Sequence, residues 1–229
     1  MDRIAELAAN LDAVRARIAR CAPDPAGVTL VAVSKERPAR DVLLLHRLGV
    51  TDFGESYESD AGPKAATLAE AGVELRWHFV GQMQRNKAAR VARYAHVVHS
   101  VDRPEVAFAL ANAATRAERS VDVLVQVRFD GSPQRAGVDP AGVPALADEI
   151  ARCASLRFAG VMCVAPLGEP PRPSFARLRE IAERLRADHP GATTISAGMT
   201  GDFEEALAEG ANCVRIGTAL FGERARAVR

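Results

Sequence analysis

The chain has 229 residues, of which 48% are hydrophobic and 26% charged, a composition that excludes a largely disordered protein. Lys and Arg number 30 and Asp and Glu 29, so the formal net charge of +1 argues against the broad basic surface of a nucleic-acid-binding protein. No apolar run reaches the roughly 18–20 residues of a membrane-spanning helix, and the charged residues 1–6 are unlike a signal peptide. We therefore expect a cytoplasmic protein without nucleic-acid or membrane partners.

An amphipathic helix is the first predicted element. Its apolar stripe consists of Ile4, Leu7, Leu11, Val14 and Ile18. Residues 28–33 form an apolar run rich in β-branched side chains, as expected of a parallel strand buried on both faces. A helix is predicted from Pro38, which suits a first helical turn, to Gly49, which suits a C-cap.

The same alternation of strand and helix continues along the chain. Further strands are predicted over residues 50–53, 76–80, 96–99, 121–127, 158–164, 193–196 and 213–216, with helices near 57–71, 85–94, 103–118, 140–153, 174–188 and 202–209. Alternation implies a parallel sheet, and eight such units match a single (β/α)8 TIM barrel with an extra N-terminal helix, formed by residues 1–229 as one domain. The alternative, a doubly wound open sheet, would carry a glycine-rich loop after its first strand. Residues 34–37 follow that strand here and contain no glycine.

The cysteines and histidines do not predict a metal site. Cys21, Cys153, Cys163 and Cys213 are widely spaced, and the last two lie in apolar runs, so reduced buried thiols are expected. The five histidines show no metal-ligand spacing.

In a barrel of this type the active site lies at the carboxyl ends of the strands. Lys35 follows the first strand, where apolar walls would favour the neutral amine that forms a Schiff base with a carbonyl; a solvated loop lysine is the alternative. The S-A-G-M-T-G-D segment of residues 196–202 follows the seventh strand and can turn backbone N–H groups toward an anion, with Asp202 as the predicted N-cap of the next helix; an ordinary capped turn is the alternative.

The eighth strand supplies Arg215 as a fixed cation, and it is followed by Gly217, which permits close approach of a ligand, and by the hydroxyl of Thr218. Loops after strands seven and eight often bind phosphate in these barrels. Because strands one and eight are neighbours in a closed barrel, Lys35 and Arg215 would share one rim. An amine beside a phosphate site fits a phosphorylated aldehyde or ketone, such as pyridoxal 5′-phosphate (PLP) or the phosphosugar of a Schiff-base aldolase.

Two strings are specific enough to indicate a family: W-H-F-V-G-Q-M-Q-R-N-K at residues 77–87 and V-R-I-G-T-A-L-F-G at 214–222. Shorter matching segments are V-A-V-S-K at 31–35, F-G-E-S-Y at 53–57, V-Q-V at 125–127, G-V-M-C at 160–163 and S-A-G-M-T at 196–200. In these segments the chain closely resembles the pyridoxal phosphate homeostasis proteins, small single-domain relatives of the alanine racemase barrel.

The resemblance implies a PLP site with a defined set of cofactor-binding positions. These are Lys35, Ser56, Ser196, Gly198, Arg215, Gly217 and Thr218. Lys35 would carry PLP as an internal aldimine, a Schiff base, while Ser196, Gly217 and Thr218 would hold the phosphate with backbone N–H groups near Gly198. Arg215 would point at the pyridine nitrogen and keep it unprotonated. The ring would then be a weak electron sink, so the site would hold the cofactor better than it would use it.

The chain departs from the family pattern at several positions. Ser56 stands where the family usually has Asn, which puts that polar contact to the cofactor in doubt, and Ala197 and Thr200 replace the commoner Met and Ser. Arg128 and Arg135 stand where Asn and Lys are frequent and bring charge near the rim. Residues 77–87 have two readings, packing and loop hydrogen bonds, or a part in handing the cofactor to other proteins.

The resemblance implies a non-catalytic PLP-binding protein, a monomer or weak homodimer, that serves intracellular PLP homeostasis and supplies PLP-dependent apoenzymes. The alternative is an amino-acid racemase, which needs acid and base groups on both faces of its substrate. In the racemases the resemblance places the second base on a further domain that we do not expect in this protein, and the only tyrosines of the sequence are Tyr57 and Tyr94. A phosphosugar aldolase is a third hypothesis, and it would contain no bound chromophore.

Overall fold

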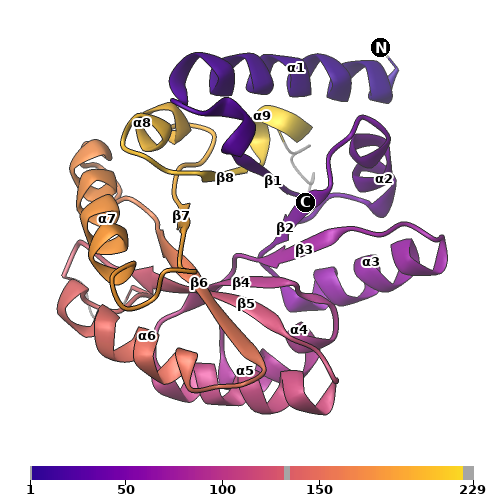
Figure 1. The fold of residues 1–229 in the computed structure, drawn as a ribbon. Helices are drawn as coiled ribbons and strands as arrows, with labels where there is room; N and C mark the ends of the chain where they lie inside the picture. The colour runs from indigo at the N-terminus through magenta and orange to yellow at the C-terminus, as the bar shows by residue number, and fades with distance from the viewer. Residues whose placement is uncertain (1, 132–134, 224–229) are drawn as a thin grey trace.

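A closed barrel of eight parallel strands, surrounded by helices, forms the centre of the computed structural model, which describes residues 2–131 and 135–223 (Figure 1). The strands are β1 (Thr29–Val33), β2 (Asp52–Glu55), β3 (Arg76–Phe79), β4 (Val97–Val101), β5 (Val121–Val127), β6 (Leu156–Cys163), β7 (Thr194–Ser196) and β8 (Cys213–Ile216). The helices are α1 (Arg3–Cys21), α2 (Ala39–Arg47), α3 (Glu58–Glu70), α4 (Ala88–Tyr94), α5 (Pro104–Arg116), α6 (Val143–Ala151), α7 (Arg172–Leu185), α8 (Phe203–Ala208) and α9 (Thr218–Phe221).

The predicted (β/α)8 barrel is confirmed. The open-sheet alternative is wrong, because β1 pairs in parallel with both β2 and β8. Each predicted strand and helix is present, with ends displaced by a few residues. The helix predicted over 85–94 begins as the 3-10 turn η2 (Arg85–Lys87), and short 3-10 turns also form at η1 (Pro25–Gly27) and η3 (Pro140–Gly142). The segment Thr218–Phe221, expected as loop, forms the short helix α9.

Helix α1 is attached to the barrel through its predicted apolar stripe. Leu7, Leu11, Val14 and Ile18 are buried, and the helix packs against α8 and α9 (Figure 1). Each such buried side chain contributes about 1.5–3 kcal/mol relative to exposure. Asn10 also donates a hydrogen bond of 2.9 Å to the carbonyl oxygen of Leu220. The additional helix therefore supports α9, which directly follows β8.

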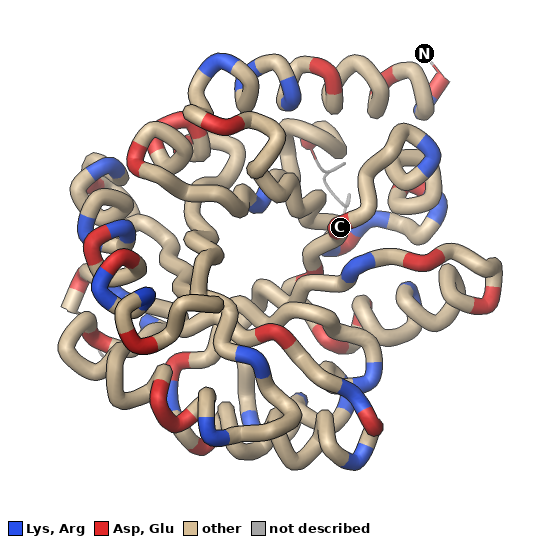
Figure 2. The backbone as a smooth tube through the Cα atoms, viewed as in Figure 1, with Lys and Arg blue, Asp and Glu red and all other residues tan. Residues whose placement is uncertain are grey.

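Charged residues of both signs are interspersed along the outer helices (Figure 2). Among residues 2–131 and 135–223, no helix combines the length and the apolar character needed to cross a membrane. All four cysteines are free thiols, and Cys163 and Cys213 are buried in β6 and β8 as predicted.

Candidate functional site at the carboxyl rim of the barrel

The two ends of the chain that carry the predicted site meet at one rim of the barrel. Val31 pairs with Arg215 and Ala32 with Ile216 across the β1–β8 ladder. A Cβ atom added to Gly217 would lie 3.4 Å from the carbonyl oxygen of Val33. The turn after β1 and the turn after β8 are therefore adjacent, as closure of the barrel predicted. Arg215, which was expected to share the rim with Lys35, lies deeper and pairs with Val31.

Lys35 lies in the turn that follows β1, and its side chain is exposed. The expected burial of its stem against apolar walls is wrong. The backbone on both sides is nevertheless fixed: the Ser34 hydroxyl donates to Glu55 Oε1 at 2.6 Å, and the Glu36 N–H donates to Asp60 Oδ2 at 3.0 Å. Glu36 has a φ of 59°, a left-handed conformation that is uncommon for a residue with a side chain. The turn thus holds an exposed amine on an anchored backbone.

The chain contains only three lysines, Lys35, Lys64 and Lys87. Lys64 is buried in α3, where its ammonium group donates to Glu55 Oε1 at 2.6 Å, to the Ser34 carbonyl oxygen at 2.9 Å and to Asp60 Oδ2 at 3.0 Å. Three hydrogen bonds, two of them to carboxylates, saturate this ammonium group. Lys64 therefore anchors the turn that carries Lys35 and does not offer a free amine.

The loops after β7 and β8 are joined by hydrogen bonds. Gly198 has a φ of 88°, and a Cβ atom there would lie 2.6 Å from the Cα atom of Phe203, so the turn requires glycine. Its carbonyl oxygen accepts from the Arg215 N–H at 3.0 Å. The Thr200 hydroxyl oxygen accepts from the Ala219 N–H at 3.2 Å. These contacts place a hydroxyl at the start of α9, a role that sequence reasoning did not assign to Thr200.

Asp202 occupies the N-cap position of α8 as predicted, but its side chain does not cap that helix. Its Oδ1 atom accepts a hydrogen bond from the Met199 N–H at 2.7 Å instead. The predicted capping contact is therefore wrong, and the carboxylate closes the loop after β7. Gly217 is the N-cap residue of α9 and Thr218 is its first residue, and the first N–H groups of a helix lack acceptors within it.

Arg215 and Ser196 lie deeper, inside the barrel. Arg215 is only 5% exposed, and burial lowers its pKa from the ordinary arginine value, although a guanidinium stays charged. It donates from Nη1 to the Ser196 hydroxyl at 2.7 Å and from Nη2 to the Cys163 carbonyl oxygen at 2.9 Å. The Ser196 hydroxyl, fully buried, also contacts His99 Nδ1 at 2.9 Å. Arg215 and His99, two partners of the Ser196 hydroxyl, are thus protein groups below the rim.

Ser56 follows β2 at the same rim and is half-buried. A Cβ atom on Gly81 would lie 1.9 Å from the Ser56 carbonyl oxygen, so the strand-to-loop turn after β3 requires glycine at that position. This contact accounts for the glycine in the string at residues 77–87. It also brings the loop after β3 against the backbone that carries Ser56.

Gly81→Ala is expected to reduce the free energy of unfolding by about 1–3 kcal/mol, because two backbones must separate to admit the methyl group. The matched control is Gly62→Ala in α3, where an added Cβ meets nothing within 4 Å. That change should stabilise the helix by about 0.5–1 kcal/mol. Urea unfolding of both variants measures the difference, and equal effects would contradict the proposed close approach.

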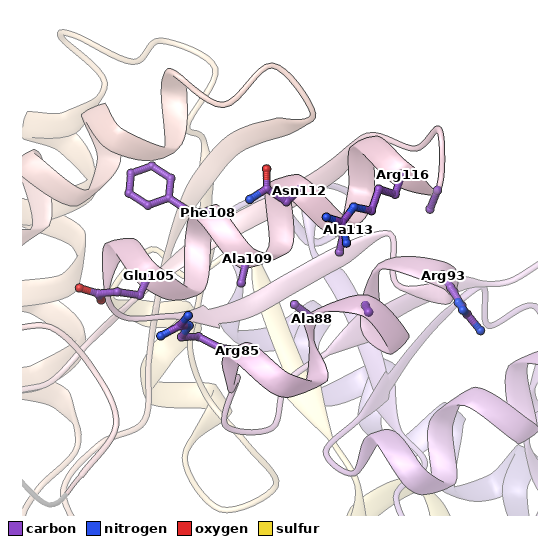
Figure 3. A pocket seen from close by; sticks show the side chains of 11 residues that line it. Arg85, Ala88, Arg93, Glu105, Phe108, Ala109, Asn112, Ala113 and Arg116 are labelled. Carbon is purple, nitrogen blue, oxygen red and sulfur yellow. The ribbon is translucent and has the colours of Figure 1, made fainter.

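A groove on the outside of the barrel lies between α4 and α5 (Figure 3). Arg85, Arg93 and Arg116 border it, and Ala88 and Ala109 belong to its lining. None of the predicted cofactor residues lines this groove. The candidate site is therefore the rim where β1, β7 and β8 end, and it is defined by the geometry of their loops.

Comparisons with known proteins agree on one family. A family model described as "Alanine racemase, N-terminal domain" matches residues 3–225. A Pseudomonas aeruginosa protein named "Pyridoxal phosphate homeostasis protein" is 41% identical, covering 95% of this chain and 96% of its own. A Mycobacterium leprae protein of the same name is 40% identical, covering 96% and 94%. The solved structure of PipY from Synechococcus elongatus with PLP bound is 33% identical, with a TM-score of 0.84, covering 94% of this chain and 100% of that one.

Proposed function

Because this chain belongs to the pyridoxal phosphate homeostasis proteins of the alanine racemase N-terminal domain family, we propose that it binds PLP and takes part in PLP homeostasis. Lys35 is the residue that binds the cofactor covalently. The observation that carries this proposal is the β1–β8 pairing, which puts the turn of Lys35 beside that of Gly217. An exposed amine and an anion-binding loop at one rim are the two groups that a phosphorylated aldehyde requires.

The residues of the rim suit the different parts of PLP. Thr200, Gly217 and Thr218 offer hydroxyl and N–H donors for the phosphate at the junction of the loops after β7 and β8. The turn at Gly198 shapes this loop, and Ser56 is a polar neighbour across the rim. The Ser196 hydroxyl is bound to Arg215 and His99, so in this proposal Ser196 supports the site through Arg215.

PLP supplies an aldehyde carbon that an amine can attack. The amine of Lys35 would hold that carbon through a Schiff base, with release of water. Arg215 would place its positive charge beside the ring nitrogen of bound PLP and so disfavour protonation of that nitrogen. The residues therefore hold the cofactor reversibly and do not favour carbanion chemistry.

The tyrosines favour binding over racemisation. Tyr94 is buried, and burial together with Glu55 and Glu58 raises the pKa of its hydroxyl, so it is a poor acid or base at neutral pH. Tyr57 is 52% exposed at the start of α3. A racemase requires positioned groups on both faces of its substrate. The protein is accordingly proposed to bind PLP and deliver it to apoenzymes that require it.

Borohydride reduction tests the proposal directly. Purified protein is incubated with PLP, reduced and digested, and the peptides are mapped by mass spectrometry. The adduct is expected on Lys35 alone among the three lysines. An adduct on Lys64 or Lys87, or none at all, would overturn the proposal. Chiral analysis of alanine incubated with the PLP-loaded protein should show no racemisation.

A further inference from the structure

A continuous line of polar side chains, all buried except the half-buried Asp52, crosses the interior of the barrel. It begins at Arg215 on β8, passes through Ser196 on β7, His99 on β4 and His78 on β3, and ends at Asp52 on β2. The successive distances are 2.7 Å from Arg215 Nη1 to Ser196 Oγ, 2.9 Å from Ser196 Oγ to His99 Nδ1, 2.8 Å from His99 Nε2 to His78 Nδ1, and 2.9 Å from His78 Nε2 to Asp52 Oδ1. Five strands thus contribute one hydrogen-bonded chain.

The donor and the acceptor of each hydrogen bond follow from the chemistry of the two end groups, the Asp52 carboxylate and the Arg215 guanidinium. The carboxylate of Asp52 only accepts, so His78 donates from Nε2 and, when neutral, must accept at Nδ1. His99 therefore donates from Nε2 and accepts at Nδ1, which requires the Ser196 hydroxyl to donate to it. Ser196 then presents its lone pairs to Arg215, which only donates. A single orientation satisfies every member of the line.

Burial supports the neutral state of both histidines. His78 is 3% exposed and His99 is 0% exposed. Burial lowers the pKa of His78 although Asp52 opposes the shift, and it lowers the pKa of His99 well below the ordinary value, with help from the charge of Arg215. Burial alone would raise the pKa of Asp52, but hydrogen bonds from His78 and Thr51 outweigh it, so that pKa is lowered. The line therefore has a charged group at each end and neutral groups between.

The far end of the line lies at the amino ends of the strands, opposite the rim. A polar cavity there is lined by residues that include Asp52, Arg76, His78, His99, Asp122 and Asn212. The interior of such a barrel is ordinarily filled by apolar side chains, and a buried polar group is costly unless it is hydrogen-bonded. Since apolar side chains would fill this interior at lower cost, we infer that the hydrogen-bonded line between the cavity and Arg215 has a function other than packing.

We propose that His99 and His78 are positioning residues for the cofactor site: they orient the Ser196 hydroxyl so that its oxygen holds the Arg215 guanidinium in place toward the ring nitrogen of bound PLP. This inference rests on the proposed function. Two donors of Arg215 are taken by Ser196 and Cys163, which fixes the plane of the guanidinium and leaves its other N–H groups for a ligand. The histidines act on the site through Ser196 and Arg215 and do not touch the cofactor.

The hydrogen-bond direction can be measured on the protein without PLP. Long-range 1H–15N NMR distinguishes the two tautomers of each histidine, and both His78 and His99 are expected as neutral Nε2–H tautomers at pH 7. An Nδ1–H tautomer or a protonated ring at either position would overturn the inference. This result does not depend on whether PLP binds.

Two variants of His99 test the effect on the cofactor. His99→Leu removes the acceptor for Ser196 and is expected to shift the absorption maximum of bound PLP and to weaken PLP binding by about tenfold. His99→Asn can place an amide oxygen near the former Nδ1 atom and should restore the wild-type spectrum and affinity. His189→Asn is the control, because His189 pairs with Asp148 outside this line and should leave both readouts unchanged.

The outcomes separate the two proposals. A wild-type protein that takes up no PLP overturns the proposed function, while the NMR tautomers still decide the orientation of the line. A His99→Leu variant that is less stable but has an unchanged spectrum and affinity overturns the positioning role. Loss of the spectral shift in His99→Asn, together with a shift in His99→Leu, supports it.

Discussion

Replacing Lys35 with Ala is expected to abolish the reducible PLP adduct while leaving the fold intact. Lys35 is exposed, so truncating it leaves neither a cavity nor an unpaired buried charge, and the free energy of unfolding should change by at most about 0.5 kcal/mol. The donors of the loops after β7 and β8 remain, so weak, non-covalent binding of PLP should persist. Mass spectrometry after borohydride treatment and equilibrium dialysis measure the two quantities separately.

Two further variants distinguish the amine from its charge. Lys35→Arg keeps a cation at the rim, but a guanidinium does not form the covalent bond, so the adduct should again be absent. Lys87→Ala removes the other lysine that lies outside the buried ion pairs, and full labelling is expected. Retention of a reducible adduct in Lys35→Ala, or its loss in Lys87→Ala, would contradict the assignment of Lys35.

The fold could be predicted because its signals are local. The run at residues 121–127 coincides with β5, since five of its seven residues are apolar, as expected of a strand buried on both faces, although Asp122 and Gln126 interrupt the run. Because β1 and β8 are neighbours in a closed barrel, the proximity of the Lys35 and Gly217 turns could be predicted without knowing the position of any side chain. The short helix Thr218–Phe221 was not predicted, because four residues carry too little periodicity to distinguish a helix from a loop.

The interior of the site was less predictable, because its contacts join distant positions. Ser196 and His99 are 97 residues apart in sequence, and their contact depends on which side chains of β4 and β7 point inward. The spacing of the histidines in the sequence gives no sign of a hydrogen-bonded line across strands. The sequence left Lys35 with two alternatives, a stem against apolar walls or a solvated loop lysine, for a related reason: its environment is set by α3 and by the turn itself, whose backbone is held by Lys64 and Asp60. The roles of the individual cofactor residues stay predictions.

Lys64→Met is expected to have the largest effect on stability. It leaves Glu55, whose side chain is 0% exposed, without its ammonium partner, and loss of one member of a buried pair costs about 3–5 kcal/mol. Burial already raises the pKa of Glu55, with Lys64 and Ser34 opposing the shift. Without Lys64 the pKa rises further, so the variant is most stable in acid, where Glu55 is protonated, and its deficit against wild type grows as the pH increases.

Urea unfolding of a double variant shows whether the pair is coupled. Glu55→Gln together with Lys64→Met leaves no buried charge and should be more stable than Lys64→Met alone by about 1–3 kcal/mol. Arg152→Met breaks a surface pair with Glu149, whose side chains are 70% and 35% exposed, and should cost at most about 1 kcal/mol. Equal losses in Lys64→Met and Arg152→Met would contradict a buried pair. Lys64 also donates a hydrogen bond to the Ser34 carbonyl oxygen in the turn that carries Lys35. Because Lys64→Met removes this contact, we expect slower labelling of Lys35 by PLP and borohydride in that variant.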